Sequence, residues 1–357
     1  PGVATSGICQ PPVHAIALAR VREITVRHHP EALAAVDDAI VELYPRLVAW
    51  HRWLHTARDP EGTGLVTIFH PWESGLDNSP RWDDALAAVT VSEQIAGARP
   101  DLDHVADVTE RPSDDDYRRY HTLVRELVDV GYDPERSHRS HPFRMDDVLF
   151  TAILAAADDV LADLAVLVGQ PGDAAGHRAG AERSRRGLDA CWDPARCACL
   201  DRDLVADRWV TADTIAGFAP LVAGCDRDRG DALAARLAGP SFAGAEQLQW
   251  AVPPSTAVDD PAFDPRLYWR GPTWPVITWL LWWALDRDGR VGLADALRTA
   301  AVEQLRATGC SEYADPVSGR ALGSPAQSWT AAVALDWLAV DADHPGAAGV
   351  AELEHSA

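Results

Sequence analysis

The 357-residue sequence contains no lysine, and all 32 of its basic side chains are arginine. Chemistry that needs a lysine ammonium is therefore excluded, including Schiff-base catalysis, a pyridoxal phosphate anchor and the phosphate-binding P-loop. The sequence also lacks the His-Glu-x-x-His, Gly-x-Ser-x-Gly and complete dinucleotide-binding signatures. These absences remove the zinc-protease helix, the serine-hydrolase elbow and the nucleotide-binding fingerprint as starting points for function.

Positive charge is scarce relative to negative charge. The 54 acidic residues outnumber the 32 basic ones, which gives a formal net charge of −22. A surface this acidic repels phosphate backbones and anionic lipid, so we expect neither a nucleic-acid partner nor a membrane partner. No apolar run reaches the roughly 18 residues of a membrane span. The first residues have neither the basic start nor the apolar stretch of a signal peptide, and we expect a cytoplasmic protein.

Patterns that bind metals or cofactors are weak. Cys197-Ala-Cys199 lacks the two-residue gap of a zinc knuckle, and the other cysteines are scattered, so we expect reduced thiols. Residues 226–231 faintly resemble a calcium loop, but Leu237 stands where that loop needs a glutamate. His51 and His55 are expected to be hydrogen-bonded helix residues. The sequence therefore predicts no metal site and no cofactor.

Helical periodicity dominates the chain. Between residues 145 and 169 apolar side chains recur at steps of three and four, as on the buried face of a helix. The pattern predicts helices at 13–27, 31–56, 114–130, 145–169, 173–192, 212–223, 230–238, 274–286, 292–308 and 328–340, and strands at 65–69 and 199–210. No low-complexity linker divides the sequence. We expect one domain over residues 1–357, a curved array of antiparallel helix pairs with long loops at one rim.

The long connections 69–82, 247–270 and 311–327 are rich in aromatic residues, proline, glycine and aspartate, and loops of this length are usually functional. In the first loop, Asp77 lies between Trp72 and Trp82, and Ser79 and Pro80 are expected to cap and open a helix. Tryptophan rings suit the apolar face of a sugar, and apolar walls can raise a carboxyl pKa. The alternative is an Asp-Asn turn with two core tryptophans.

The other two loops carry further candidates. Tyr268, Trp269 and Trp274 precede or open a predicted helix and can face a cavity. Glu312 follows the helix stop at Gly309, and alone it would be an ordinary solvated acid. Together with Asp77 it gives two carboxyls from distant loops, which is what glycosidic cleavage requires when they meet at one pocket.

These segments together resemble the bacterial mannosylglycerate and glucosylglycerate hydrolases, relatives of glycoside hydrolase family 63. The matching stretches span nearly the whole chain in the family's order: 5–14, 70–83, 111–120, 268–279, 312–316 and 327–331. The resemblance implies an all-α fold, the (α/α)6 barrel or helical toroid. The ten or eleven predicted helices are one or two short of twelve, and family members have a further N-terminal stretch. We therefore expect a barrel incomplete at its N-terminus, unless another polypeptide supplies the missing helices.

The resemblance also implies roles for individual residues. Asp77 would be the general acid and Glu312 the general base of an inverting hydrolysis. An arginine fork matches a glycerate carboxylate, which fits Arg111 in the aglycone site. The remaining residues that the resemblance places at the substrate are Gln10, Tyr268, Trp269 and Gln327 around the aglycone, and Trp72 and Trp274 at the sugar.

We therefore expect a hydrolase of a small-molecule α-glycoside, glucosylglycerate or mannosylglycerate. One alternative is a neutral disaccharide or oligosaccharide α-glucosidase of the same fold, and the role of Arg111 discriminates between the two. Another is a non-catalytic sugar-binding or vestigial homologue, which would bind a glycoside without releasing product. The sequence leaves open whether the protein forms a homo-oligomer or binds a second chain that supplies N-terminal helices.

Overall fold

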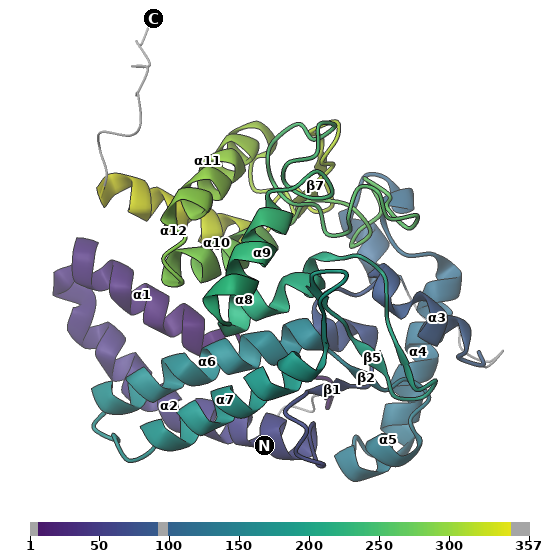
Figure 1. Cartoon of the computed structure of the whole chain (residues 1–357), viewed down its shortest axis with the longest axis horizontal. Coiled ribbons are helices and arrows are strands. Elements are labelled where there is room, and N and C mark those ends of the chain that lie inside the picture. The colour runs from purple at the N-terminus through teal and green to yellow at the C-terminus, as the bar shows by residue number, and fades with distance from the viewer. Residues whose placement is uncertain (1–5, 92–98, 344–357) are drawn as a thin grey trace, which may run out of the picture.

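The computed structural model describes residues 6–91 and 99–343 and is predominantly helical (Figure 1). Thr5, the first residue of the 5–14 segment, lies outside the described residues. The α-helices are α1 His14–His28, α2 Leu33–Ala57, α3 Asp83–Ala87, α4 Asp114–Asp129, α5 Pro134–Ser140, α6 Val148–Leu167, α7 Ala174–Ala190, α8 Ala219–Ala223, α9 Arg227–Leu237, α10 Pro275–Arg287, α11 Val291–Thr308 and α12 Ser328–Asp343. The predicted helical fold is confirmed.

Short elements connect these helices. The strands, each of two residues, are β1 Thr67–Ile68, β2 Met145–Asp146, β3 Trp192–Asp193, β4 Ala198–Cys199, β5 Arg202–Asp203, β6 Arg208–Trp209, β7 Tyr313–Ala314 and β8 Ala321–Leu322. The 3₁₀ helices are η1 Pro30–Ala32, η2 Pro71–Ser74, η3 Pro80–Trp82, η4 Pro100–His104, η5 Val108–Glu110 and η6 Ile215–Phe218.

Helix α6 lies at the centre of the helical region, in contact with α1, α2, α7 and α8 (Figure 1). Every side chain from Val148 to Asp158 is buried, and many of them are alanine, so the neighbouring helices approach closely. The helix begins at Val148 because the Asp147 carboxylate accepts hydrogen bonds from the backbone N–H groups of Leu149 and Phe150. The periodicity placed this start at Met145, which belongs to β2 instead.

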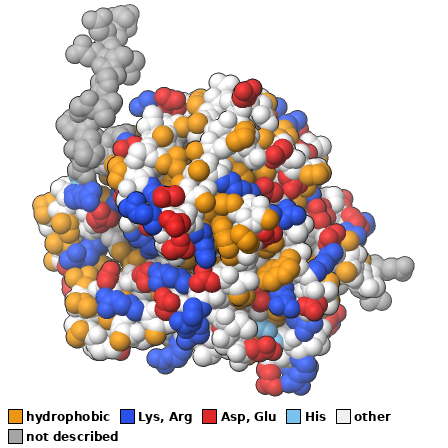
Figure 2. Space-filling model, viewed as in Figure 1, with side chains coloured by type: hydrophobic (Ala, Val, Ile, Leu, Met, Phe, Trp, Pro, Cys, Tyr) orange, Lys and Arg blue, Asp and Glu red, His pale blue; other side chains and the backbone are white. Residues whose placement is uncertain are grey.

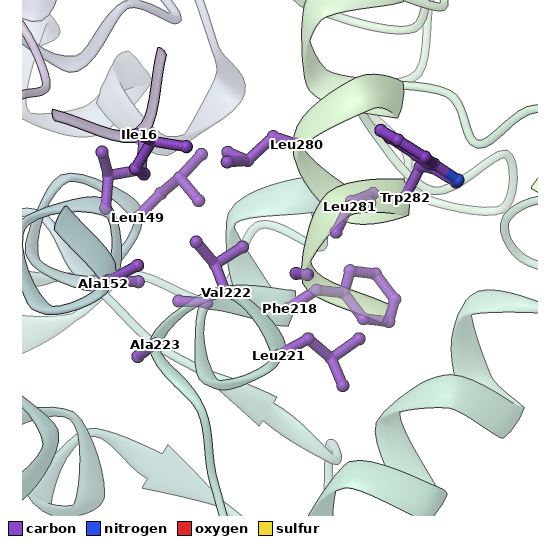
Figure 3. Packing of buried hydrophobic residues seen from close by; sticks show 14 of the residues in the cluster. Ile16, Leu149, Ala152, Phe218, Leu221, Val222, Ala223, Leu280, Leu281 and Trp282 are labelled. Atoms are coloured by element: carbon purple, nitrogen blue, oxygen red, sulfur yellow. The ribbon is translucent and has the colours of Figure 1, made fainter. Parts of the chain in front are cut away.

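The main hydrophobic cluster joins segments that are far apart in the sequence. Figure 3 shows Leu280 of α10 directed toward Ile16 of α1 and Leu149 of α6, with Val222 of α8 beside them. All four side chains are buried. Burial of such side chains is the main favourable term in folding, so this cluster fixes α10, and the loop that precedes it, against the N-terminal helices.

A small antiparallel sheet leads into the first long loop. Its strand order is β1-β2-β5-β6, with Thr67 opposite Asp146 and Ile68 opposite Met145. The predicted strand at 65–69 is confirmed at its centre. The predicted strand at 199–210 is instead broken into β4, β5 and β6, and the turn between the last two contains Asp207 with a positive φ of 52°. The sheet thereby fixes the start of the loop that carries Asp77.

One predicted helix begins later than the sequence indicated. The predicted helix 212–223 is α-helical only from Ala219, because Pro220 belongs in a first turn, where its missing N–H costs no hydrogen bond. Thr214, inside the predicted range, forms an isolated bridge with Thr256.

Helix α5 was not predicted because it is too short to show a period. Asp133 caps it by accepting from Arg136 N, and Pro134 opens it.

Ion pairs occupy much of the surface. Figure 2 shows arginine and acidic side chains interspersed on the viewed face, with scattered apolar side chains between them. In the interior, His51 Nδ1 and His55 Nε2 both lie within hydrogen-bond distance of the Asp158 carboxylate, at 2.7 and 2.6 Å. Both histidines are therefore hydrogen-bonded helix residues, as the sequence predicted. Within residues 6–91 and 99–343, no helix combines the length and apolar character needed to cross a membrane.

Two glycines in the loop between α2 and β1 give a matched stability test. Gly62 and Gly64 both have positive φ, 70° and 87°. A Cβ at Gly62 would meet no atom within 4 Å, whereas a Cβ at Gly64 would overlap the backbone carbonyl of Arg183 in α7. We expect Gly62→Ala to cost about 1–2 kcal/mol for the left-handed backbone alone. Gly64→Ala should cost about 1–3 kcal/mol more, since overpacking is added.

Urea unfolding monitored by circular dichroism measures both costs, provided that the m value is unchanged. Equal midpoints for the two variants would contradict close packing of this loop on α7.

Candidate active site

A buried carboxylate anchors the loop that carries Asp77. Glu73, in η2, is fully buried and pairs with both terminal nitrogens of Arg58, at 2.5 and 2.8 Å. It also accepts hydrogen bonds from the backbone N–H groups of Phe69 and Cys9. Its lone pairs are thus filled from three parts of the chain, and Arg58 holds the pKa of this carboxyl below its usual value despite burial. The N-terminal segment and the loop are fixed to each other here.

The turn around Asp77 is closed by Trp82, whose indole N–H donates to the Leu76 carbonyl at 3.0 Å. Pro80 opens η3, as the sequence predicted. Ser79 occupies the N-cap position, as predicted, but its hydroxyl makes no capping hydrogen bond and instead accepts from Arg81 Nε at 3.3 Å. The result is a tight turn that presents the Asp77 side chain, which is partly accessible to solvent.

Two tyrosines contact Asp77. The Tyr268 hydroxyl donates to Asp77 Oδ2 at 3.4 Å, and the Tyr120 hydroxyl donates to the Asp77 backbone carbonyl at 3.1 Å. Desolvation raises the pKa of Asp77 to about 7. The Tyr268 hydrogen bond and the charge of Arg111 lower that pKa, and the charge of Glu312 raises it, but desolvation outweighs them. At neutral pH this carboxyl can carry a proton.

Tyr268 is held in an unusual backbone conformation. Its φ is +44°, a region that non-glycine residues rarely occupy without support from their surroundings. The support comes from Trp274, whose indole N–H donates to the Tyr268 carbonyl at 3.1 Å, and from Asn78, whose Oδ1 accepts from Trp269 N at 2.9 Å. Asn78 follows Asp77 directly, so the acid loop itself positions the tyrosine.

Trp269 and Trp274 lie behind Tyr268. Their rings stack at a centroid distance of 3.6 Å, and they are only 2% and 1% exposed. Trp274 also stacks on Tyr313 at 4.6 Å. In this arrangement the two indoles support the tyrosine and present almost no surface of their own.

Glu312 comes directly before β7 and after Gly309, whose positive φ follows the end of α11. The Arg111 guanidinium holds it with two bonds, Nη2 to Oε2 at 2.5 Å and Nη1 to Oε1 at 3.3 Å. The backbone N–H of Ser324 donates to Oε2 at 3.0 Å. Both side chains of the pair are buried, with 8% of Arg111 and 5% of Glu312 exposed.

The structure brings the side chains from the three long loops together. The guanidinium carbon of Arg111 lies 4.4 Å from the ring centre of Tyr268, and the Tyr268 hydroxyl reaches Asp77. Asp77 and Glu312 are therefore connected through two side chains, Tyr268 and Arg111, although they are 235 positions apart in the sequence. A protonatable carboxyl and an ion-paired carboxylate share one site.

The other predicted site residues, Trp72, Gln10 and Gln327, make hydrogen bonds or ring contacts outside the series Asp77, Tyr268, Arg111 and Glu312. Trp72 is partly buried against His70 and Tyr120, and Gln10 is exposed and donates through Nε2 to the Trp72 carbonyl. Gln327 is partly buried, and its backbone N–H donates to the Cys310 carbonyl.

One residue with a clear structural role was not singled out from the sequence. Glu110 is 2% exposed and pairs with Arg266 and Arg320, and its Oε2 accepts from the backbone N–H of Gly323. Gly323 immediately precedes Ser324, which donates to Glu312. The only sequence signal was its position next to Arg111, and its partners lie more than 150 residues away.

Metal ligands do not gather at this site or elsewhere in the part of the chain that the structure describes. Within residues 6–91 and 99–343, no cluster of three or more histidine, cysteine, aspartate or glutamate side chains could hold a metal ion.

Comparisons with known proteins agree with this architecture. The chain matches the mannosylglycerate hydrolase MGH1-like glycoside hydrolase domain over residues 1–330. It is 42% identical to glucosylglycerate hydrolase of Mycolicibacterium hassiacum over 337 residues, which cover 94% of this chain and 75% of that protein. It is 37% identical to mannosylglycerate hydrolase MGH1 of Selaginella moellendorffii, covering 94% of this chain and 66% of that protein. The chain thus spans 66% and 75% of the length of these two relatives.

Solved structures show the same relationship. The crystal structure of the glycoside hydrolase family 63 mannosylglycerate hydrolase from Thermus thermophilus in complex with Tris superposes with a TM-score of 0.85 at 38% identity. The match covers 94% of this chain and 78% of that one. Neutral trehalase of Saccharomyces cerevisiae, at 16% identity and a TM-score of 0.53, shares the fold alone.

The fold and the family match define a glycoside hydrolase. Within that class, the chain belongs to the mannosylglycerate hydrolase MGH1-like family.

The raised pKa of Asp77 predicts a stability effect. An unfolded aspartate loses its proton near pH 3.8, whereas the folded one keeps it until about pH 7. Between these values the folded state binds more protons, so stability falls with rising pH, by at most about 1.4 kcal/mol per unit for one group. Asp77→Asn has no carboxyl at this position to titrate, so its stability does not fall in this way between pH 4 and pH 7. The free energy of unfolding of the variant relative to wild type should therefore rise from pH 4 to pH 7 and stay level above it.

Urea unfolding at half-unit pH steps tests this, and Asp231→Asn, at an exposed ion pair with Arg290, is the control. A difference between Asp77→Asn and wild type that is independent of pH would contradict the raised pKa.

Proposed function

We propose that this chain hydrolyses a small anionic α-glycoside, glucosylglycerate or mannosylglycerate, with inversion at the anomeric carbon. The observation that carries the proposal is the connection of Asp77 to Glu312 through Tyr268 and Arg111. Two carboxyls at one site, one of them protonated, are the groups that this reaction uses. The names of the relatives from Mycolicibacterium hassiacum and Thermus thermophilus support the substrate class.

Asp77 is the proposed general acid. With a pKa of about 7, a large fraction of the carboxyl is protonated at neutral pH, and the proton can pass to the leaving glycosidic oxygen. Glu312 is the proposed general base. It takes one proton from the attacking water as the water oxygen bonds to the anomeric carbon and the bond to the glycosidic oxygen breaks. The reaction needs an acid, a base and water, and we propose no cofactor.

The aglycone carboxylate is proposed to bind at Arg111. The guanidinium lies against the Tyr268 ring, and its Nε–H is buried without a hydrogen-bond partner among the described residues. An additional acceptor would satisfy that donor. The Thermus thermophilus enzyme has been solved with Tris and D-glycerate, and with glucose, which supports recognition of the same two halves.

The remaining predicted residues keep narrower proposed roles. Trp72 is partly exposed and can offer its ring to a sugar face, whereas Trp269 and Trp274 act by holding Tyr268. Gln10 and Gln327 remain proposed contacts to the aglycone.

The finer architecture is part of the proposal. We place the helices in an (α/α)6 barrel that forms one domain with its loops at the substrate, as the likeness to the family 63 structure supports. Three further expectations remain predictions. They are a cytoplasmic location, the absence of nucleic-acid and membrane partners, and a homo-oligomer or a second chain as partner.

The first test is turnover. Purified protein is incubated with each glycerate glycoside, and the released sugar is followed by proton NMR. An α-glycoside should give the β-anomer first. Asp77→Ala and Glu312→Ala should each lower kcat by at least about 10²-fold, the usual contribution of general acid–base catalysis. The matched controls Asp231→Ala and Glu182→Ala remove carboxylates at exposed ion pairs and should keep full activity. Undiminished turnover in either site variant would overturn the assignment.

The pH profile gives a second test. The alkaline limb of kcat/KM should lie near pH 7, because it reports loss of the Asp77 proton in the free enzyme. The Tyr268 hydrogen bond favours the charged carboxylate, so Tyr268→Phe should raise the pKa of Asp77 and move this limb to higher pH. A limb that stays in place or moves to lower pH would show that Asp77 does not set it.

A further inference from the structure

The carboxylate of Glu312, the proposed base, already accepts several hydrogen bonds in this structure. Arg111 and the Ser324 amide together fill three of the four acceptor positions of the Glu312 carboxylate, both on Oε2 and one on Oε1. A carboxylate bonded in this way has little capacity left to take a proton from water. Charge-assisted bonds to a guanidinium are among the strongest hydrogen bonds in proteins, so the pair resists opening unaided.

One donor of the Arg111 guanidinium has no acceptor among the described residues, which favours binding of a further anion. Its Nε–H is buried and has no hydrogen-bond partner among residues 6–91 and 99–343, which costs free energy in a desolvated site. Its side chain makes hydrogen bonds to Glu312 alone in that part of the chain, and its guanidinium also lies against the rings of Tyr268 and Tyr313. A second carboxylate that approaches this guanidinium can therefore compete with Glu312 directly.

We infer that Arg111 is a substrate-operated gate, which leaves Glu312 for the carboxylate of an acidic aglycone and thereby frees the base. The inference rests on the proposed function. One arginine–carboxylate pair replaces another, so the exchange is nearly balanced in free energy. Ser324 N continues to hold Oε2 and keeps Glu312 in place, and Oε1 becomes free to accept the water proton.

A neutral aglycone cannot operate this gate. It offers no anion, so Arg111 stays on Glu312 and the base remains occupied even when the sugar is bound. Selectivity for acidic glycosides is then expressed in kcat. Simple recognition of the carboxylate, equal in ground and transition states, would change KM alone. Arg111 is thus a specificity-determining residue that acts through the base.

The first experiment compares glucosylglycerate with glucosylglycerol, in which a hydroxymethyl group replaces the carboxylate, or the mannosyl pair if mannose is the sugar. Wild type should show a kcat at least about tenfold lower on the neutral glycoside, the rate equivalent of one charge-assisted hydrogen bond. Arg111→Met should raise kcat on the neutral glycoside above wild type and raise KM for the anionic one. A merely structural role would lower both rates.

Arg20→Met is the matched control: Arg20 of α1 pairs with the buried Asp336 of α12, and neither is among the residues assigned to the site, so both rates should stay unchanged. Circular dichroism and the melting temperature check that Arg111→Met is folded.

The second experiment needs no variant. An α-glycosyl fluoride of the same sugar loses fluoride without help from an acid, but its hydrolysis still needs a base to take the water proton. Free D-glycerate should therefore activate wild-type hydrolysis of the fluoride saturably, by about tenfold. It should not activate Arg111→Met, and Glu312→Ala should be inactive with or without it. Inhibition by glycerate at all concentrations, or equal activation of Arg111→Met, would overturn the gate.

The two proposals fail in different ways. If wild type releases no sugar from either glycerate glycoside, the proposed function is wrong. If it hydrolyses them, yet turns over neutral and anionic glycosides with equal kcat and is not activated by glycerate, the function stands and the gate is wrong. If Arg111→Met does not fold, the response of wild type to glycerate decides.

Discussion

The buried pair between Arg111 and Glu312 is the interaction on which the organisation of this site depends. It joins the segment before α4 to the hairpin of β7 and β8, and it brings the guanidinium under Tyr268. Two similar pairs, Arg58 with Glu73 and Arg81 with Asp201, fix the loop that carries Asp77. Arginine presents a planar fork that matches a carboxylate in two places, which lysine cannot do. A chain with arginine as its only basic residue thus uses it to position loops precisely.

The two central carboxyls differ in their partners, and the difference suits the two proposed roles. Among the described residues, Asp77 has a neutral hydroxyl as its side-chain donor and no arginine bonded to it, so desolvation dominates and favours the protonated form. Glu312 instead has a guanidinium and a backbone amide bonded to it. Separation of protonated and ionised carboxyls by their surroundings is the usual basis for assigning an acid and a base.

Much of this arrangement could be predicted from the sequence. Periodicity located the long helices, because burial of one face dominates their composition, and loop composition located Asp77, Tyr268 and Glu312. The pairing of Arg111 with Glu312 could not be read in this way, because the two residues are 201 positions apart and either could have faced solvent. The same holds for Glu110. The burial of Trp269 and Trp274 was missed because an aromatic residue before a helix suits a cavity wall and a stacked support equally well.

The contacts also indicate which parts of the site can move. Tyr268 is fixed at both ends, its carbonyl by the Trp274 indole and its hydroxyl by Asp77, and a strained φ persists only where the surroundings over-determine the backbone. The Arg111 side chain has hydrogen bonds to one partner among the described residues, and it rests on ring faces that do not constrain it in direction. Arg111 therefore has hydrogen bonds to a single side chain among the described residues, whereas Tyr268 is held at both its carbonyl and its hydroxyl. In the proposed exchange the arginine loses one ion pair and gains another, whereas displacement of Tyr268 would disturb its contacts to both Asp77 and Trp274.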